Sequence, residues 1–139
     1  MGRQLINQVL LKTANFLVTR AARPWAWGEW DCNLFITEYL DHLDGGRRSE
    51  YIRGKYSTLK EAIRFQKTIP SAPEWVSLQG YGIITTSALE DYDIVLEQES
   101  GYWHAGLVFN GHIWSVEIDR GTVMKPIEAQ EYTLGRQHG

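Results

Sequence analysis

The single cysteine, Cys32, is the residue of this chain best suited to covalent chemistry. It follows Asp31, whose carboxylate is a favourable helix N-cap, so the sequence predicts Cys32 in the first turn of a helix. There the helix dipole and the unpaired backbone N–H groups favour an anion, and we expect them to lower the thiol pKa below its free value of about 8.5. The alternative is a small, inert core residue, and only a partner base favours the reactive interpretation.

His104 is the candidate base, because a predicted β-hairpin gives its imidazole polar neighbours. The Asn110-Gly111 pair is typical of a two-residue turn, and this register pairs His104 with Glu117 and Gly106 with Ser115. His104, Ser115 and Glu117 then share one side, where a hydroxyl and a carboxylate can orient an imidazole, and we expect the cysteine end of the helix to dock there. The alternative is a purely structural histidine. The opposite side is predicted to be an apolar packing surface made of Leu107, Phe109, Trp114, Val116 and Ile118.

Two helices are predicted around the cysteine segment. Apolar residues at three- and four-residue spacing predict a helix over 32–43, and Gly45-Gly46 supplies its C-terminal cap. A capping box at 58–61 predicts a second helix that runs to about Lys67. These helices would hold Cys32 and cover one face of a sheet.

Other segments before residue 93 carry weaker signals. Residues 5–17 predict an amphipathic helix, whereas 47–57 are polar and are expected to be irregular. Pro70 and Pro73 are interpreted as closing the helix that precedes them. In the stretch 71–92 the sequence predicts only a short helical turn at 87–91.

From Asp93 onward the hydrophobic period changes to two, which predicts successive antiparallel strands. Four strands are expected, over 93–97, 102–109, 112–118 and 122–127. Helices first and strands afterwards indicate an α+β domain, with N-terminal helices packed on a C-terminal antiparallel β-sheet. With 139 residues and 43% hydrophobic content, residues 1–139 are expected to form a single domain.

Composition excludes several classes of function. A net charge of −3 removes the main reason to expect a nucleic-acid partner. A local basic run over 47–67 is interpreted as a solvated surface, with docking or anion binding as the alternative. One cysteine cannot form an intramolecular disulfide, and the four histidines are scattered, so we expect no metal and no cofactor. Polar residues interrupt the N-terminal apolar positions, which is not typical of a signal peptide or a membrane span.

Three tryptophans precede the cysteine, at Trp25, Trp27 and Trp30. Gly28 allows this loop to turn. Large rings at this position serve either as core packing or as the wall of a cleft, and the sequence does not separate the two.

Several short motifs, in this order along the chain, carry a resemblance to a known family. They are Gly28 before Asp31-Cys32-Asn33-Leu34, then Tyr92-Asp93-Ile94-Val95, then His104-Ala105-Gly106-Leu107-Val108 with its Asn-Gly turn. Together they resemble the NlpC-type cell-wall cysteine peptidases, which are small papain-like α+β domains. The WAWGEWDC loop, the Arg53–Ser57 segment and Glu61-Ala62 resemble a tailed-phage branch found among tail-tip proteins. The resemblance spans residues 24–118.

The resemblance implies a papain-like fold in which Cys32 is the thiolate nucleophile and His104 the general base. It also implies a third polar residue on the following strand, usually His, Asn or Gln, and the matching residue here is Ser115. Glu117, opposite His104 in the predicted register, is the alternative orienting residue. The sequence departs from the family at Trp25, where the family has tyrosine, and in Cys-Asn-Leu, where Cys-Ser-Gly is usual.

The function that the resemblance implies is hydrolysis of the peptide stems of bacterial peptidoglycan by a phage tail-tip protein during cell entry. The protein would be made in the host cytoplasm without a signal peptide, and would join other tail-tip proteins in the virion. The alternative is a structural tail-tip or tail-assembly component with a degenerate, inactive cysteine-peptidase site. A lipid-directed thiol acyltransferase shares the Cys/His chemistry, but the sequence offers it no membrane-facing segment.

Overall fold

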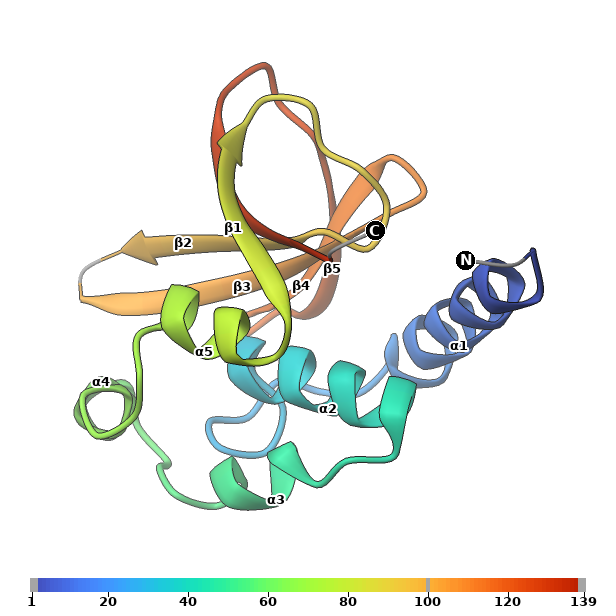
Figure 1. Ribbon diagram of the computed structural model, residues 1–139. Coiled ribbons are helices and arrows are strands. Elements are labelled where there is room, and N and C mark those ends of the chain that lie inside the picture. The colour runs from blue at the N-terminus through green and yellow to red at the C-terminus, as the bar shows by residue number, and fades with distance from the viewer. Residues whose placement is uncertain (1–2, 100, 138–139) are drawn as a thin grey trace.

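The computed structural model describes residues 3–99 and 101–137, and its helices precede its strands along the chain (Figure 1). The helices are α1 (Arg3–Arg20), α2 (Cys32–Asp44), α3 (Arg48–Ile52), α4 (Leu59–Gln66) and α5 (Ala72–Leu78). The strands are β1 (Tyr81–Thr86), β2 (Ile94–Glu99), β3 (Tyr102–Phe109), β4 (His112–Glu117), β5 (Gly121–Pro126) and β6 (Tyr132–Gln137). They form one antiparallel sheet in the order β1-β6-β2-β3-β4-β5, which confirms the predicted α+β class.

Helix α2 is the central helix, and it forms where the sequence predicts it. Its apolar stripe buries Leu34, Phe35 and Tyr39 completely, and the helix contacts both α3 and β3 (Figure 1). Gly45 ends it with a φ of 73°, a left-handed conformation that suits glycine. Burial of this stripe fixes the helix, and therefore its first residue Cys32, against the sheet.

The β3–β4 hairpin follows the predicted register only near its turn. Phe109 pairs with His112 and Leu107 with Trp114, as predicted, but the pairing between the two strands ends there. Further along β3, the backbone N–H of Trp103 donates to Gln66 Oε1 at 2.9 Å, and its carbonyl accepts from Gln66 Nε2 at 3.2 Å. A side-chain amide from α4 thus takes the backbone groups that a neighbouring strand would otherwise bond.

The two sides of the sheet carry separate apolar clusters. Cys32 and Val116 lie in the main cluster with the α2 stripe, whereas Val108 and Ile113 lie in a second cluster. The apolar packing surface is therefore confirmed, except that Ile118 is 43% exposed. The body of α2 does not dock on the Gly106 side but packs on the more apolar side. Its first residue, Cys32, nevertheless reaches His104 of the Gly106 side, as expected.

Four elements were not predicted, and one predicted turn is absent. Helix α3 has five residues, too few to show a helical period, and its N-cap residue Arg47 makes no capping bond. Asp41 of α2 accepts from the N–H groups of Arg48 and Ser49 instead. In α5, Ser71 accepts from the N–H of Glu74. Pro73, one of the two prolines expected to close the preceding helix, lies in the first turn of α5, where proline is tolerated. Strands β1 and β6 lack a clear alternation of buried and exposed residues over their full length.

Residues 87–91 do not form the expected helical turn. Arg136 donates to the carbonyl of Ala88 at 2.9 Å, and Asp93 accepts from the N–H of Glu90 at 2.8 Å. The carbonyl of Ala88 and the N–H of Glu90 are therefore bonded to side chains and do not form the hydrogen bonds of a helical turn.

Candidate active site

The cap of α2 places Cys32 as the sequence predicts. One carboxylate oxygen of Asp31 accepts from the N–H groups of Asn33 and Leu34, each at 3.0 Å. The other accepts from the N–H of Gly28 at 2.9 Å, which ties the preceding loop to the helix. Cys32 is therefore the first residue of the helix, and it is only 2% exposed.

Three groups of β3 surround the thiol. Cys32 Sγ lies 3.5 Å from the hydroxyl of Tyr102, 3.7 Å from the carbonyl oxygen of Trp103 and 4.0 Å from Nδ1 of His104. The structure thus brings Cys32 and His104 together, although they are far apart in the sequence. Sγ can bond weakly to each of these groups, and only the imidazole can take its proton.

The expectation of a lowered thiol pKa is wrong for this structure. Burial raises the pKa of Cys32 to about 11, and the negative charge of Asp31 acts in the same direction. The hydrogen bond from Tyr102 lowers it, but by less than burial raises it. Burial also lowers the pKa of His104 below its ordinary value. The resting pair is therefore a neutral thiol beside a neutral imidazole.

The charged group that faces the far side of the imidazole is Glu99. Its carboxylate lies 4.0 Å from Nε2 of His104, and its negative charge raises the imidazole pKa, against the larger effect of burial. Ser115 donates instead to the carbonyl of Ala105 at 2.9 Å. Glu117 forms ion pairs with Arg120 and Lys125 at 3.0 and 3.1 Å. Both residues still line the same groove as His104.

A buried polar network joins the helix cap to the thiol. The Nδ2 atom of Asn33 donates to the hydroxyls of Tyr56 and Tyr102, each at 3.2 Å. Tyr56 in turn donates to Asp31 at 2.7 Å. These roles were not predicted, although one signal was available: Tyr102 is two residues before His104, so both side chains share a side of a strand.

The tryptophan loop contains both a core ring and a ring near the thiol, the two alternatives that the sequence did not separate. Trp30 is 1% exposed and belongs to the core. Trp27 stands edge-on to Tyr102, with the ring centroids 5.7 Å apart, and so forms part of the wall around the thiol. Trp25, which occupies the position of the family tyrosine, packs against Trp27 at 5.3 Å.

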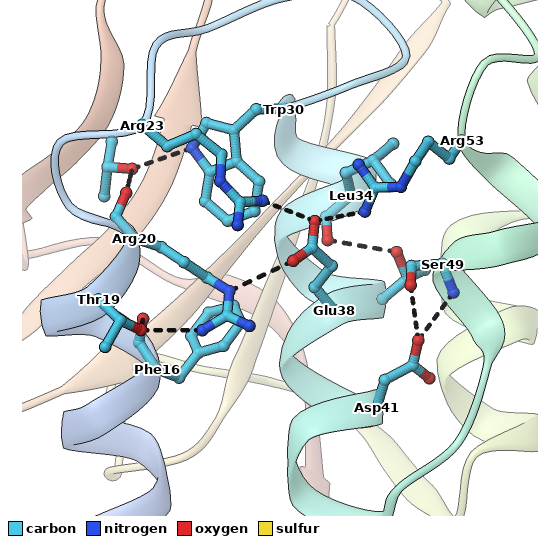
Figure 2. Close-up of polar contacts among 12 residues, drawn as sticks. Phe16, Thr19, Arg20, Arg23, Trp30, Leu34, Glu38, Asp41, Ser49 and Arg53 are labelled. Atoms are coloured by element: carbon cyan, nitrogen blue, oxygen red, sulfur yellow. Dashed lines mark hydrogen bonds and ion pairs between the residues drawn. The ribbon is translucent and has the colours of Figure 1, made fainter.

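An ion-pair cluster fixes the loop that leads to the cysteine (Figure 2). Glu38 of α2 accepts from Arg20 at 3.3 Å, from Arg23 at 2.9 Å and from Arg53 at 2.7 Å. Arg53 also donates to the carbonyl of Glu29 at 3.0 Å. One carboxylate thereby joins the end of α1, the tryptophan loop and the end of α3, which limits the movement of the segment before Cys32.

A groove of about 460 Å³ opens beside His104 on the side of the sheet opposite α2. Four carboxylates line it, against two cationic side chains: Glu97, Glu99, Glu117 and Glu128 against Arg120 and Lys125. The groove therefore favours cationic ligands by charge. Among residues 3–99 and 101–137, no three His, Cys, Asp or Glu side chains are grouped as a metal site.

The fold and the site define a small α+β protein with a buried cysteine beside a half-buried histidine, at the junction of a helix start and a sheet. The chain belongs to the family described as Domain of unknown function (DUF6950), whose model matches residues 8–133. No curated protein matches the sequence. None of the helices in the described part of the chain is long and apolar enough to cross a membrane.

Proposed function

We propose that the protein is a cysteine-dependent hydrolase of amide bonds. The observation that carries the proposal is the contact of 4.0 Å between Sγ of Cys32, in the first turn of α2, and Nδ1 of His104, on β3. A nucleophile within reach of a base, which is itself faced by a third polar group, is the arrangement that activates thiols for acyl transfer. Here the third group is Glu99.

The reaction begins with transfer of the Sγ proton to His104 Nδ1, and the thiolate then attacks the carbonyl carbon of the substrate. The negative oxygen of the tetrahedral intermediate accepts from the backbone N–H of Cys32 at the helix start. His104 gives its proton to the departing amine as the carbon–nitrogen bond breaks, which leaves a thioester on Cys32. Water, deprotonated by His104, then releases the acid and restores the thiol.

The substrate that we propose is the peptide stem of bacterial peptidoglycan, on the basis of the resemblance to NlpC-type peptidases of phage tail tips. Such stems can carry free amino groups, and the excess of carboxylates in the groove beside His104 attracts these groups. The protein would act in the tail of a phage particle, next to other tail-tip proteins, after synthesis in the host cytoplasm.

A second candidate is a structural tail-tip component whose inherited site is inactive. Two observations favour it. Burial raises the pKa of Cys32 to about 11, and the hydroxyl of Ser115, at the position of the family's third residue, is bonded to a backbone carbonyl.

Digestion of purified peptidoglycan tests the first candidate against the second. The wild-type protein should release peptide fragments that mass spectrometry can identify, and Cys32→Ser and His104→Ala should abolish their release. His112→Ala is the matched control, because that imidazole bonds Asn110 near the hairpin turn and should leave activity unchanged. Intact peptidoglycan after incubation with the wild-type protein would contradict the proposed substrate.

A further inference from the structure

The orientation of the polar network around the thiol can be deduced from the groups whose donor or acceptor role is fixed. A backbone N–H only donates, so Gln66 must turn its Oε1 towards the N–H of Trp103. A backbone carbonyl only accepts, so the carbonyl of Trp103 must accept from Gln66 Nε2. This Nε2 also lies 3.4 Å from Asn33 Oδ1, to which it donates its second hydrogen. Asn33 therefore turns its donating Nδ2 towards the two tyrosines.

The hydroxyl protons of these tyrosines have defined directions as a result. Tyr56 and Tyr102 both accept from Asn33 Nδ2, so each must send its own proton elsewhere. Tyr56 donates to the carboxylate of Asp31 at 2.7 Å. The remaining acceptor for Tyr102 is Cys32 Sγ, 3.5 Å from its oxygen.

We propose that Tyr102 is a further catalytic residue, whose hydroxyl donates a hydrogen bond to Cys32 Sγ and stabilises the thiolate that attacks the substrate. When His104 takes the thiol proton, the Sγ–H bond breaks and an Nδ1–H bond forms, and Tyr102 keeps its own proton throughout. Its donated bond strengthens as Sγ becomes charged. This inference rests on the proposed function for its catalytic meaning, but the hydrogen bond can be tested without a substrate.

The position of Tyr102 suits this role. The side chain is 2% exposed, and its ring lies edge-on to His104 with the centroids 4.9 Å apart. Burial raises the pKa of Tyr102 far above its ordinary value, so the hydroxyl keeps its proton at neutral pH and can donate. Burial therefore has two effects: it opposes ionisation of Cys32, and it keeps the Tyr102 hydroxyl protonated so that it can stabilise the thiolate.

Four titratable groups face the thiol and must be considered in any pH profile. Asp31 belongs to the cap of α2, Tyr56 follows α3, and Tyr102 and His104 belong to β3. Asp31 opposes the thiolate by charge, and Gln66, the group from α4 near the thiol, is neutral. Tyr102→Phe leaves the charges of these groups in place, so a change in the ionisation of Cys32 reports the loss of the hydroxyl with its bonds to Sγ and to Asn33.

The test is the rate of Cys32 alkylation by iodoacetamide as a function of pH in the folded protein. Tyr102→Phe should raise the pH at which the thiol itself ionises, and should slow alkylation about tenfold at any lower pH, the usual size of a hydrogen bond to a charged group. Tyr81→Phe is the matched control, because it removes the hydroxyl of another buried tyrosine, on β1. It should leave the profile unchanged.

Asn33→Ala gives a second variant for the case in which Tyr102→Phe does not fold. It removes the amide that directs the Tyr102 proton, so alkylation should slow by a smaller factor than in Tyr102→Phe. A wild-type profile in a folded Tyr102→Phe protein, or in Asn33→Ala if only that variant folds, would overturn the inference. Hydrolysis through Cys32 and His104 would remain possible after that result. Conversely, a wild-type protein that does not cleave peptidoglycan would contradict the proposed function but not the hydrogen bond from Tyr102 to Cys32.

Discussion

At the scale of single residues, two opposing effects decide the state of Cys32. A charge at a helix N-terminus gains about 2 kcal/mol at most, which corresponds to less than 2 pKa units. Full burial can shift a pKa by 3–5 units in the other direction, so burial prevails. Cys32 is 2% exposed, and its pKa rises to about 11. The thiol therefore needs His104 to become nucleophilic near neutral pH.

Of the three carboxylates that act on His104, which are Glu99, Glu97 and Glu117, the first and the last should differ in their effect on it. Because the charge of Glu99 raises the imidazole pKa, Glu99→Gln should lower that pKa further, and the base should titrate at a lower pH. Glu117→Gln is the control, since that carboxylate is engaged by Arg120 and Lys125 and should matter less. An NMR titration of the His104 ring measures both changes. A larger shift in Glu117→Gln would mean that the predicted register, not the observed one, describes the site.

At the scale of elements, the loop before α2 depends on one glycine. Gly28 has a φ of +74°, and a Cβ at this position would collide with the carbonyl of Tyr56. Its own carbonyl accepts from the N–H of Gly54 at 2.9 Å. This close approach joins the loop to the segment after α3, which also supplies Arg53 to the Glu38 cluster (Figure 2).

Gly28→Ala should therefore destabilise the protein more than the left-handed backbone alone requires. Gly45→Ala is the matched control, because Gly45 has a φ of +73° and nothing within 4 Å of the position of a Cβ. The control should cost about 1 kcal/mol, and Gly28→Ala about 2 kcal/mol more, from the collision and the lost bond. Urea unfolding measures both values. Equal losses in the two variants would show that the close approach contributes nothing to stability.

The elements show where sequence reasoning succeeds and where it cannot. Helix α2, its Asp31 cap and the strands β2 to β5 follow from local period and capping, which depend on neighbours in the sequence. The β3–β4 pairing ends after Leu107, and further along β3 the backbone of Trp103 bonds Gln66, a residue of another element. No local pattern contains that contact, so the predicted pairing of His104 with Glu117 could not be corrected from the sequence.

At the scale of the whole molecule, the site lies between a helix and a sheet that come from distant parts of the sequence. Helix α2 supplies Cys32 and Asn33, and β3, some 70 residues later, supplies Tyr102 and His104 (Figure 1). The pairing of cysteine and histidine could be proposed from residue types, because the two residues are complementary in chemistry. Burial of the thiol could not, since it depends on Tyr102, a residue of another element whose hydroxyl contacts Sγ and whose ring packs against Trp27.

The central claim is that Cys32 and His104 act as one unit, and the pH dependence of Cys32 alkylation with and without His104 tests it most directly. In the wild-type protein the rate should rise as pH increases through the pKa of His104, which burial lowers, and again as the thiol ionises towards about pH 11. His104→Ala should lose the first rise and keep the second. Identical profiles for the two proteins, or an unreactive thiol in both at neutral pH, would contradict the hydrolase and favour the structural role.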